Sequence, residues 1–192
     1  MTDYLSRMKK KFSLFDCPLV NNFSQASKTE SADLTKIFDN TLVATEPVNA
    51  VTLVQNHDTQ PGQALYLPVE DFFKPLAYAL ILLRHAGYPA VFYGDLYGIS
   101  GPEKGEPPAC GGQLGDFILA RKLYAYGQED SYFDFATCVG WVRLGTADRK
   151  NGCAVVMSNA GPGEKKMWVG EMHKGETWTD VVWAPRRVRW QS

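Results

Sequence analysis

The feature that most constrains the fold is a long apolar helical segment between two short apolar segments. Residues 69–86 place apolar side chains in two adjacent rows of helical period, and Pro75 falls early, where a helix tolerates proline. Residues 50–54 before it and 90–93 after it are apolar without polar alternation, which is typical of buried strands. This order predicts a βαβ crossover in a parallel sheet.

A second strand–helix pair precedes this unit. Residues 12–19 read as an apolar strand closed by a proline, residues 21–31 as a polar loop, and residues 34–42 as a short helix with Asp33 as its N-cap. Repeated pairs of strand and helix indicate an α/β fold whose parallel sheet is either open or closed into a barrel. Residues 3–11 predict the tail of an amphipathic helix without an N-cap, so we expect the chain to begin in the middle of a fold.

The second half of the chain has a different pattern. Residues 98–115 are rich in glycine and proline and predict a long irregular loop, and residues 114–126 predict a helix. After Gly127 the helical signal is lost. Short strands are predicted instead at 138–144, 153–157 and 166–169. We therefore expect an α/β part at residues 1–128 and a small antiparallel β-domain at residues 129–192.

The composition excludes several function classes. The 192 residues include 20 basic and 21 acidic ones, so the chain has neither a nucleic-acid footprint nor a polybasic membrane anchor. No apolar stretch is long enough to span a bilayer, and the first residues lack the features of a signal peptide. The cysteines form no C-x-x-C pair, which favours a reducing compartment. They are Cys17, Cys110, Cys138 and Cys153, and the first and last are expected to be buried.

Polar side chains that could perform chemistry follow strand 50–54 directly. Asn56, His57 and Asp58 stand where the strand stops, and the catalytic residues of parallel barrels stand at such strand ends. A plain turn is the other interpretation, because Asn and Asp also build turns. Asp95 likewise follows a strand, but beside a turn glycine a structural role is favoured. His57 suits a general base, a metal ligand or a donor to a substrate, and no second histidine or cysteine stands at ligand spacing.

No nucleophile or nucleotide-binding motif accompanies these residues. The sequence contains no G-x-S-x-G, no G-x-x-x-x-G-K-[ST] and no G-x-G-x-x-G after a strand. Large aromatic side chains of the β-domain are candidate platforms for sugar stacking, although core packing is the favoured use of each. These are Tyr132, Trp141, Trp168 and Trp178.

Residues 51–63 resemble the seventh-strand motif of α-amylases, which are (β/α)8-barrel (TIM-barrel) glycoside hydrolases. The likeness is to the liquefying bacterial type and its intracellular fungal relatives. Further segments resemble the sixth and eighth strands, two helices and the C-terminal β-domain of that family. They are 12–22, 72–79, 87–89, 92–95, 122–127, 161–163 and 175–178. The resemblance implies an α/β fold made of about strands 6–8 of the barrel, followed by an incomplete antiparallel β-domain.

The resemblance also implies a retaining glycosidase that acts on α-1,4-glucans such as starch, glycogen and maltooligosaccharides. In that family a nucleophile, a general acid/base and a third carboxylate act together. Asp58 matches the third, which stabilises the transition state by accepting hydrogen bonds from the 2-OH and 3-OH of the sugar. His57 would donate to a hydroxyl of the same sugar, and Asn56 would orient the strand end. The intracellular relatives and the missing signal peptide predict a cytoplasmic location.

The chain departs from the family pattern in its catalytic acids. The nucleophile belongs to the fourth strand and the general acid to the fifth, whereas the chain resembles the family only from the helix after the fifth strand. We therefore expect a fragment that is inactive alone. A non-catalytic glucan-binding or regulatory remnant is the alternative. A metal-dependent hydrolase centred on His57 and Asp58 is the least favoured interpretation.

Calcium is expected in complete members of the family, with one ion between the barrel and the β-domain. The matching positions here are Thr137 and Asn159, and neither side chain is charged. The main calcium site of the family lies upstream of the segments that resemble it. No cofactor and no metal ligand is therefore assigned within this chain.

Overall fold

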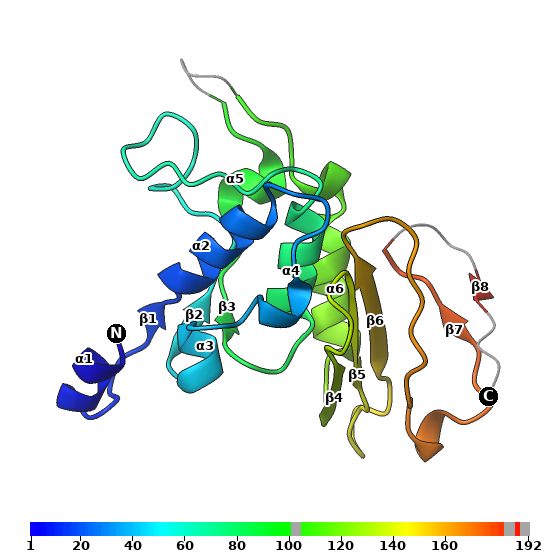
Figure 1. Ribbon diagram of the computed structural model, residues 1–192. Coiled ribbons are helices and arrows are strands. Elements are labelled where there is room, and N and C mark those ends of the chain that lie inside the picture. Colours follow the sequence, from blue (N-terminus) through cyan, green and yellow to red (C-terminus); the bar gives the residue numbers. More distant parts are fainter. Residues whose placement is uncertain (101–104, 183–186, 189–192) are drawn as a thin grey trace.

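The computed structural model describes residues 1–100, 105–182 and 187–188 (Figure 1). Helices lie between a small parallel sheet and an antiparallel sheet. The helices are α1 (Thr2–Arg7), α2 (Cys17–Ala26), α3 (Leu42–Thr45), α4 (Lys74–Leu82), α5 (Tyr93–Tyr97) and α6 (Leu114–Tyr124), with the 3-10 turns η1 (Leu34–Lys36), η2 (Cys110–Gly112) and η3 (Glu171–His173). The strands are β1 (Leu14–Phe15), β2 (Ala50–Thr52), β3 (Tyr88–Pro89), β4 (Glu129–Tyr132), β5 (Cys138–Arg143), β6 (Cys153–Ser158), β7 (Trp178–Thr179) and β8 (Arg187–Val188). Among the described helices, none is long and apolar enough to cross a bilayer.

β2 is the central strand of the parallel sheet, whose order is β1-β2-β3. Leu14 of β1 pairs with Ala50, and Tyr88 of β3 pairs with Val51. α4 connects β2 to β3, so the predicted βαβ crossover is confirmed. The chain is therefore of the α/β class in this part.

The prediction for residues 12–31 is wrong in its details. β1 has only two residues, and α2 begins inside the predicted strand. Pro18 stands in the first turn of α2, where its missing N–H leaves no hydrogen bond unmade, instead of closing a strand. Most of the predicted polar loop is thus helical, with Phe23 in the core. Cys17 is exposed at the start of this helix rather than buried as predicted, and Cys153 is half-buried.

Asp16 joins the parallel sheet to two helices. Its fully buried carboxylate accepts hydrogen bonds from the N–H groups of Leu19 at 3.2 Å, Leu42 at 3.0 Å and Val43 at 2.7 Å. These N–H groups belong to the first turns of α2 and α3, where a helix provides no partner of its own. The N–H of Asp16 donates to the carbonyl of Val51 at 2.9 Å. One residue therefore ties β1, β2 and both helix starts together.

Two predicted helices are shorter than expected. α4 replaces the predicted helix at 69–86, with Pro75 in its first turn as predicted and with turns before it. The helix predicted at 34–42 is only the 3-10 turn η1, although Asp33 caps it by accepting a hydrogen bond from the N–H of Thr35 at 3.0 Å. The helix predicted at 114–126 is confirmed by α6.

The strand after α4 lies earlier in the sequence than predicted. β3 lies at residues 88–89, before the predicted strand 90–93, although the N–H of Ala90 still donates to the carbonyl of Thr52 at 2.7 Å. Gly87, with φ +83°, turns the chain into β3, and a side chain there would press against Thr52. Asp95 lies on α5 and not at the end of a strand, which corrects its predicted place at the mouth of the sheet.

The antiparallel sheet has the order β4-β5-β6 and packs its buried face into the same core as the helices. β5 and β6 confirm the strands predicted at 138–144 and 153–157. The strand predicted at 166–169 is wrong, because the N–H of Trp168 donates to the Tyr132 hydroxyl at 2.9 Å rather than to a neighbouring strand. β7 and β8 pair with each other, and most of the predicted tail after residue 182 lies outside the described residues.

The connection from α6 to β4 is closely packed. Gly127 has φ +80° and forms a bridge with Gly145, and a side chain at Gly127 would collide with the carbonyl of Gly145. The buried guanidinium of Arg143 donates to the carbonyl of Gly127 at 3.0 Å and to that of Leu83 at 3.3 Å. Arg143 therefore fastens β5 to the end of α4 and to the glycine turn.

Glu129 of β4 makes a second link to the segment after α4. One carboxylate oxygen accepts from Arg84 Nε at 2.9 Å, and the other accepts from the backbone N–H of His85 at 2.7 Å. Burial raises the pKa of Glu129, but the Arg84 charge and the bonds from His85 outweigh it and hold this pKa below its ordinary value. The ionised carboxylate is thus the form that stabilises the fold.

Replacing Asp16 by alanine is expected to lower the free energy of unfolding by about 3 kcal/mol, because three buried N–H groups lose their acceptor. Urea denaturation followed by circular dichroism measures the loss. The exposed Asp39→Ala is the matched control and should change this free energy by less than about 0.5 kcal/mol. Equal losses in the two variants would contradict the role given to Asp16.

Replacing Glu129 by glutamine is expected to lower the free energy of unfolding at pH 7 by about 3 kcal/mol, as when one partner of a buried ion pair is removed. The folded-state pKa of Glu129 lies below the unfolded one. Its contribution is therefore present above the unfolded pKa and is lost as the pH falls below its ordinary value of 4.5.

The measurement is the melting temperature of both proteins between pH 7 and pH 3. The difference between wild type and Glu129→Gln should shrink as the solution becomes more acidic. The control is Asp130→Asn on the same strand. Within the part of the chain that the structure describes, its carboxylate accepts a hydrogen bond from the exposed Gln128 side chain alone. If the difference in melting temperature between wild type and Glu129→Gln does not change with pH, the ionised form of Glu129 does not stabilise the fold as proposed.

Candidate functional site

The turn after β2 presents the polar side chains that follow this strand. Val54 and Gln55 are still buried, whereas His57 and Asp58 are exposed. The chain thus passes from the core to the surface within a few residues. In a parallel sheet this is the carboxyl end of the central strand, the position at which α/β folds place ligand-binding groups.

Asn56 fixes the shape of this turn. Its side-chain oxygen accepts hydrogen bonds from the N–H groups of Asp58 at 2.9 Å and Thr59 at 3.0 Å. The Thr59 hydroxyl in turn accepts from the N–H of Asn56 at 3.0 Å. Such side-chain to backbone bonds make a compact Asx turn. Asn56 therefore orients the strand end, and the two residues that follow it, His57 and Asp58, extend outward.

His57 and Asp58 lie together on the surface. His57 Nε2 is 3.4 Å from Asp58 Oδ1, and the two side chains are 80% and 57% exposed. A carboxylate that accepts and an imidazole that donates are thus both open to a ligand. The pair can form hydrogen bonds with hydroxyl groups at the end of β2. Residues 56–58 form a turn, as one interpretation predicts, and this turn also presents polar side chains at the strand end, as the other interpretation requires.

Asp95 is not part of this exposed pair. Its carboxylate is buried on α5, where it accepts from the Tyr78 hydroxyl at 2.5 Å and lies 3.4 Å from Lys74 Nζ. Burial raises the pKa of Asp95, while the Tyr78 hydroxyl and the Lys74 ammonium oppose this shift. A carboxylate enclosed by two fixed partners holds helices together, which agrees with the structural role favoured from the sequence.

Lys74 is a buried cation that sequence reasoning missed. It opens α4, is 3% exposed, and lies 3.4 Å from both Asp95 and Glu106. The signal that could have found it is a lysine in the first turn of an otherwise apolar helix, where a positive charge opposes the helix dipole. Such a lysine needs acidic partners from elsewhere in the chain.

The aromatic candidates of the β-domain separate into two groups. Trp141 is fully buried and stacks on Phe133, as core packing predicts. Trp168 is 54% exposed, so core packing is wrong for this residue. Trp168 lies in the segment 166–169, where the predicted strand is not formed.

The positions that match the family's calcium site carry no carboxylate. The N–H of Asn159 donates to the carbonyl of Thr137 at 3.2 Å, and the Asn159 side-chain nitrogen donates to the carbonyl of Ala32 at 2.9 Å. Calcium requires six to eight oxygen ligands, usually with carboxylates among them. The Asn159 side-chain oxygen is buried and has no hydrogen-bond partner within the described residues, so it offers one oxygen ligand. Within the same residues no three His, Cys, Asp or Glu side chains form a metal-binding group.

A pocket of about 550 Å³ lies away from the strand end, between η1, the segment after α4, and β4 with the residues that follow it. Neither His57 nor Asp58 lines it. The exposed pair therefore lies on an open surface, and the pocket belongs to the junction of the two sheets.

Comparison with known proteins gives close matches along nearly the whole chain. An α-amylase of Bacillus licheniformis is 44% identical over 184 residues, which is 95% of this chain and 36% of that protein. The cytoplasmic α-amylase of Escherichia coli is 47% identical over 188 residues, which is 93% of this chain and 38% of that protein. Nearly the whole chain is similar to the C-terminal part of α-amylases. The resemblance drawn from residues 51–63 is confirmed, including its restriction to the C-terminal part of the family.

The α-amylase relatives are longer than this chain, which spans little more than a third of their length. A glucan 1,4-α-maltohexaosidase of Bacillus sp. is 45% identical over 182 residues, 94% of this chain and 35% of that protein. A crystal structure of a gamma-CGTase from alkalophilic Bacillus clarkii matches 71% of this chain and 23% of its own, with 16% identity and a TM-score of 0.44. No family model matches the chain.

The melting temperature of the chain is expected to be the same in excess calcium and in excess EDTA, because neither Thr137 nor Asn159 provides the carboxylate that calcium sites usually contain. A ligand that binds only the folded state would raise it. Differential scanning fluorimetry makes the comparison. Asn159→Asp, which removes the donor to Ala32, should lower the melting temperature without rescue by calcium. A higher melting temperature in calcium for the wild-type chain would contradict the assignment.

Proposed function

We propose that the chain is the carboxyl-side part of an α-amylase-type glycoside hydrolase that acts on α-1,4-glucans. The observation that supports this most is the 42–47% identity of nearly the whole chain to proteins of this kind, with His57 and Asp58 exposed at the end of the central parallel strand. In this proposal the sheet β1-β2-β3 corresponds to strands 6–8 of a (β/α)8 barrel, residues 1–128 are the barrel part, and residues 129–192 are the β-domain.

Asp58 is proposed as the carboxylate that binds and distorts the sugar ring. An ionised carboxylate has two oxygens with four acceptor positions, so it can accept from two adjacent hydroxyls such as the 2-OH and 3-OH. Bonds to the 2-OH that strengthen in the transition state contribute several kcal/mol to glycosidic cleavage. The open position of Asp58 and the turn fixed by Asn56 suit this role.

His57 is proposed as a donor to a hydroxyl of the same sugar. Its Nε2 lies 3.4 Å from Asp58, so both groups can reach one ring. A carboxylate that accepts and an imidazole that donates bind a vicinal diol more selectively than either group alone. Neither group is assigned proton transfer to the glycosidic oxygen.

Hydrolysis with retention needs a nucleophile and an acid/base about 5 Å apart. The resemblance places both on strands of the family that this sequence does not match. We therefore propose that the 192-residue chain binds α-glucan without cleaving it. A non-catalytic glucan-binding remnant would also bind α-glucan without cleaving it. The hydrolase differs from such a remnant in one respect: its nucleophile and its acid/base belong to the same protein as His57 and Asp58.

The substrates and the location follow from the relatives alone. Starch, glycogen and their oligosaccharides are the proposed substrates. A cytoplasmic location is proposed from the cytoplasmic α-amylase of Escherichia coli, which is 47% identical. Calcium is proposed only for complete members of the family, since neither Thr137 nor Asn159 carries a charge.

The purified chain is expected to release no reducing sugar from soluble starch. A reducing-end assay with the Escherichia coli cytoplasmic α-amylase as positive control measures this. Any release that scales with the concentration of the chain and survives repurification would refute the proposal that it lacks the two acids.

Maltoheptaose is expected to shift the amide resonances of residues 56–60 in a 15N-labelled chain, because Asp58 and His57 bind the sugar directly. Asp58→Asn removes a charge-assisted acceptor and should weaken binding at these resonances by about tenfold. Asp148→Asn, on the exposed β5–β6 turn, is the matched control and should leave the affinity unchanged. Resonances of residues 56–60 that do not move at any sugar concentration would contradict the assignment.

A further inference from the structure

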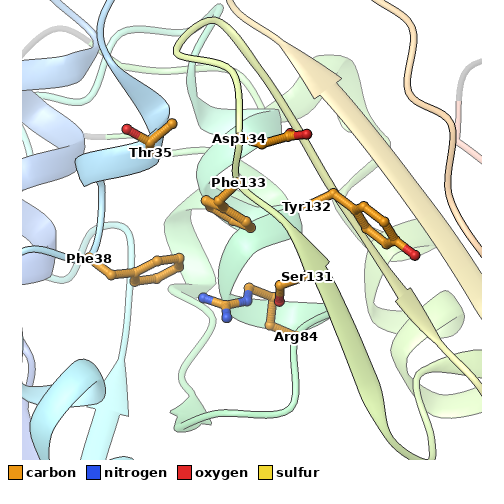
Figure 2. Close-up of a pocket in the computed structure, with 7 residues that line it drawn as sticks. All are labelled: Thr35, Phe38, Arg84, Ser131, Tyr132, Phe133 and Asp134. Carbon is orange, nitrogen blue, oxygen red and sulfur yellow. The ribbon is translucent and has the colours of Figure 1, made fainter.

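The pocket at the junction of the two sheets is built from three separate segments (Figure 2). Thr35 and Phe38 come from η1 and the residues after it, Arg84 follows α4, and Ser131 lies on β4. In Figure 2 the side chains of Phe38, Phe133 and Arg84 point toward one another. The volume of about 550 Å³ is within the range of roughly 300–1,000 Å³ typical of small-molecule sites.

Arg84 is held in place while part of it stays available. Its Nε donates to Glu129 at 2.9 Å, and Glu129 is fixed by the N–H of His85 and by the Ser131 hydroxyl at 3.0 Å. Within the described residues neither terminal amino group of Arg84 has a hydrogen-bond partner. The two terminal amino groups of Arg84 therefore remain available as oriented hydrogen-bond donors to a ligand.

Aromatic rings form the apolar wall beside these donors. The centroids of Phe38 and Phe133 are 6.0 Å apart, and the guanidinium carbon of Arg84 is 4.4 Å and 5.2 Å from them. Phe133 also stacks on the buried Trp141, which fixes its ring. A rigid apolar wall next to planar donors suits a ligand that has one apolar face and polar edges.

The charges of the pocket favour a neutral ligand. Arg84 is already neutralised by Glu129, and the carboxylate of Asp134 pairs with Lys165. An ionic ligand would thus meet no unbalanced opposite charge. Ring hydroxyls both donate and accept, and they match the Arg84 donors, the Asp134 carboxylate and the lone pairs of the Thr35 and Ser131 hydroxyls.

We propose that the junction pocket is a second carbohydrate site, which binds a neutral sugar ring of an α-glucan between Arg84, Asp134 and the wall of Phe38 and Phe133. The choice of α-glucan rests on the proposed function, whereas the preference for a neutral polyhydroxylated ring follows from the pocket. None of the residues at the end of β2 lines the pocket, so the two sites bind independently.

The test is titration of the 15N-labelled chain with maltotriose. The amide resonances of residues 131–134 and the Arg84 Nε resonance should shift and saturate. Ser131→Trp fills the pocket from an exposed strand position that tolerates an aromatic residue, and it should abolish these shifts. Asp148→Trp, on the exposed turn between β5 and β6 and outside the pocket lining, is the matched control and should keep them. Asp134→Asn, whose side chain is 71% exposed and whose amide oxygen can still accept from Lys165, should weaken binding by about tenfold.

Asp58→Asn separates this inference from the proposed function. The shifts at residues 131–134 should be the same in Asp58→Asn and in the wild-type chain. If residues 56–60 respond to sugar and residues 131–134 do not, the junction site is refuted and the proposed function stands. If only residues 131–134 respond, the junction site stands and the strand-end assignment fails. Tighter binding of gluconate than of maltotriose at the pocket would overturn its neutral ligand class.

Discussion

The carboxylate of Asp16 is the interaction on which the α/β part of the chain depends. It is fully buried and accepts three backbone N–H groups, one from α2 and two from α3, while its own N–H pairs with β2. A negative charge at the start of a helix is favoured by the helix dipole, and here one charge serves two helix starts. The direction of β2, and hence of the turn with His57 and Asp58, follows from this arrangement.

The two sheets are joined by groups that also shape the junction pocket. Arg84 stacks on Phe38, which follows η1, and on Phe133, which follows β4, and its ion pair with Glu129 fixes it between them. The terminal amino groups of Arg84 take no part in this ion pair and are available as donors in the junction pocket. Arg84 therefore stabilises the junction through Nε and offers its two terminal nitrogens to the proposed ligand.

The parts of the fold that the sequence predicts are those with local signals. β2, α6, β5 and β6 follow from hydrophobic pattern, and the cap at Asp33 lies two residues from its partner. The start of α2 could not be predicted, because the N–H groups that fix Asp16 include two that lie 26 and 27 residues away.

The same limit applies to the candidate site. His57 and Asp58 are found because they adjoin a strand, and their place on the surface agrees with that reading. Asp95 has an equally suggestive neighbourhood, but its environment is set by Lys74 and Tyr78, 21 and 17 residues earlier. The junction pocket draws Phe38, Arg84 and Phe133 from distant segments without any motif, so only the three-dimensional arrangement reveals it.

The glycine at the connection from α6 to β4 has a consequence for how the chain can be rebuilt. Gly127 leaves no room for a side chain beside Gly145, and the Arg143 guanidinium donates a hydrogen bond to the Gly127 carbonyl. The residues between β5 and β6, in contrast, are exposed at 146–151. A fusion, a reporter insertion or a circular permutation should therefore enter at that exposed turn, where the backbone is solvated, and not at the apparent border between the two parts.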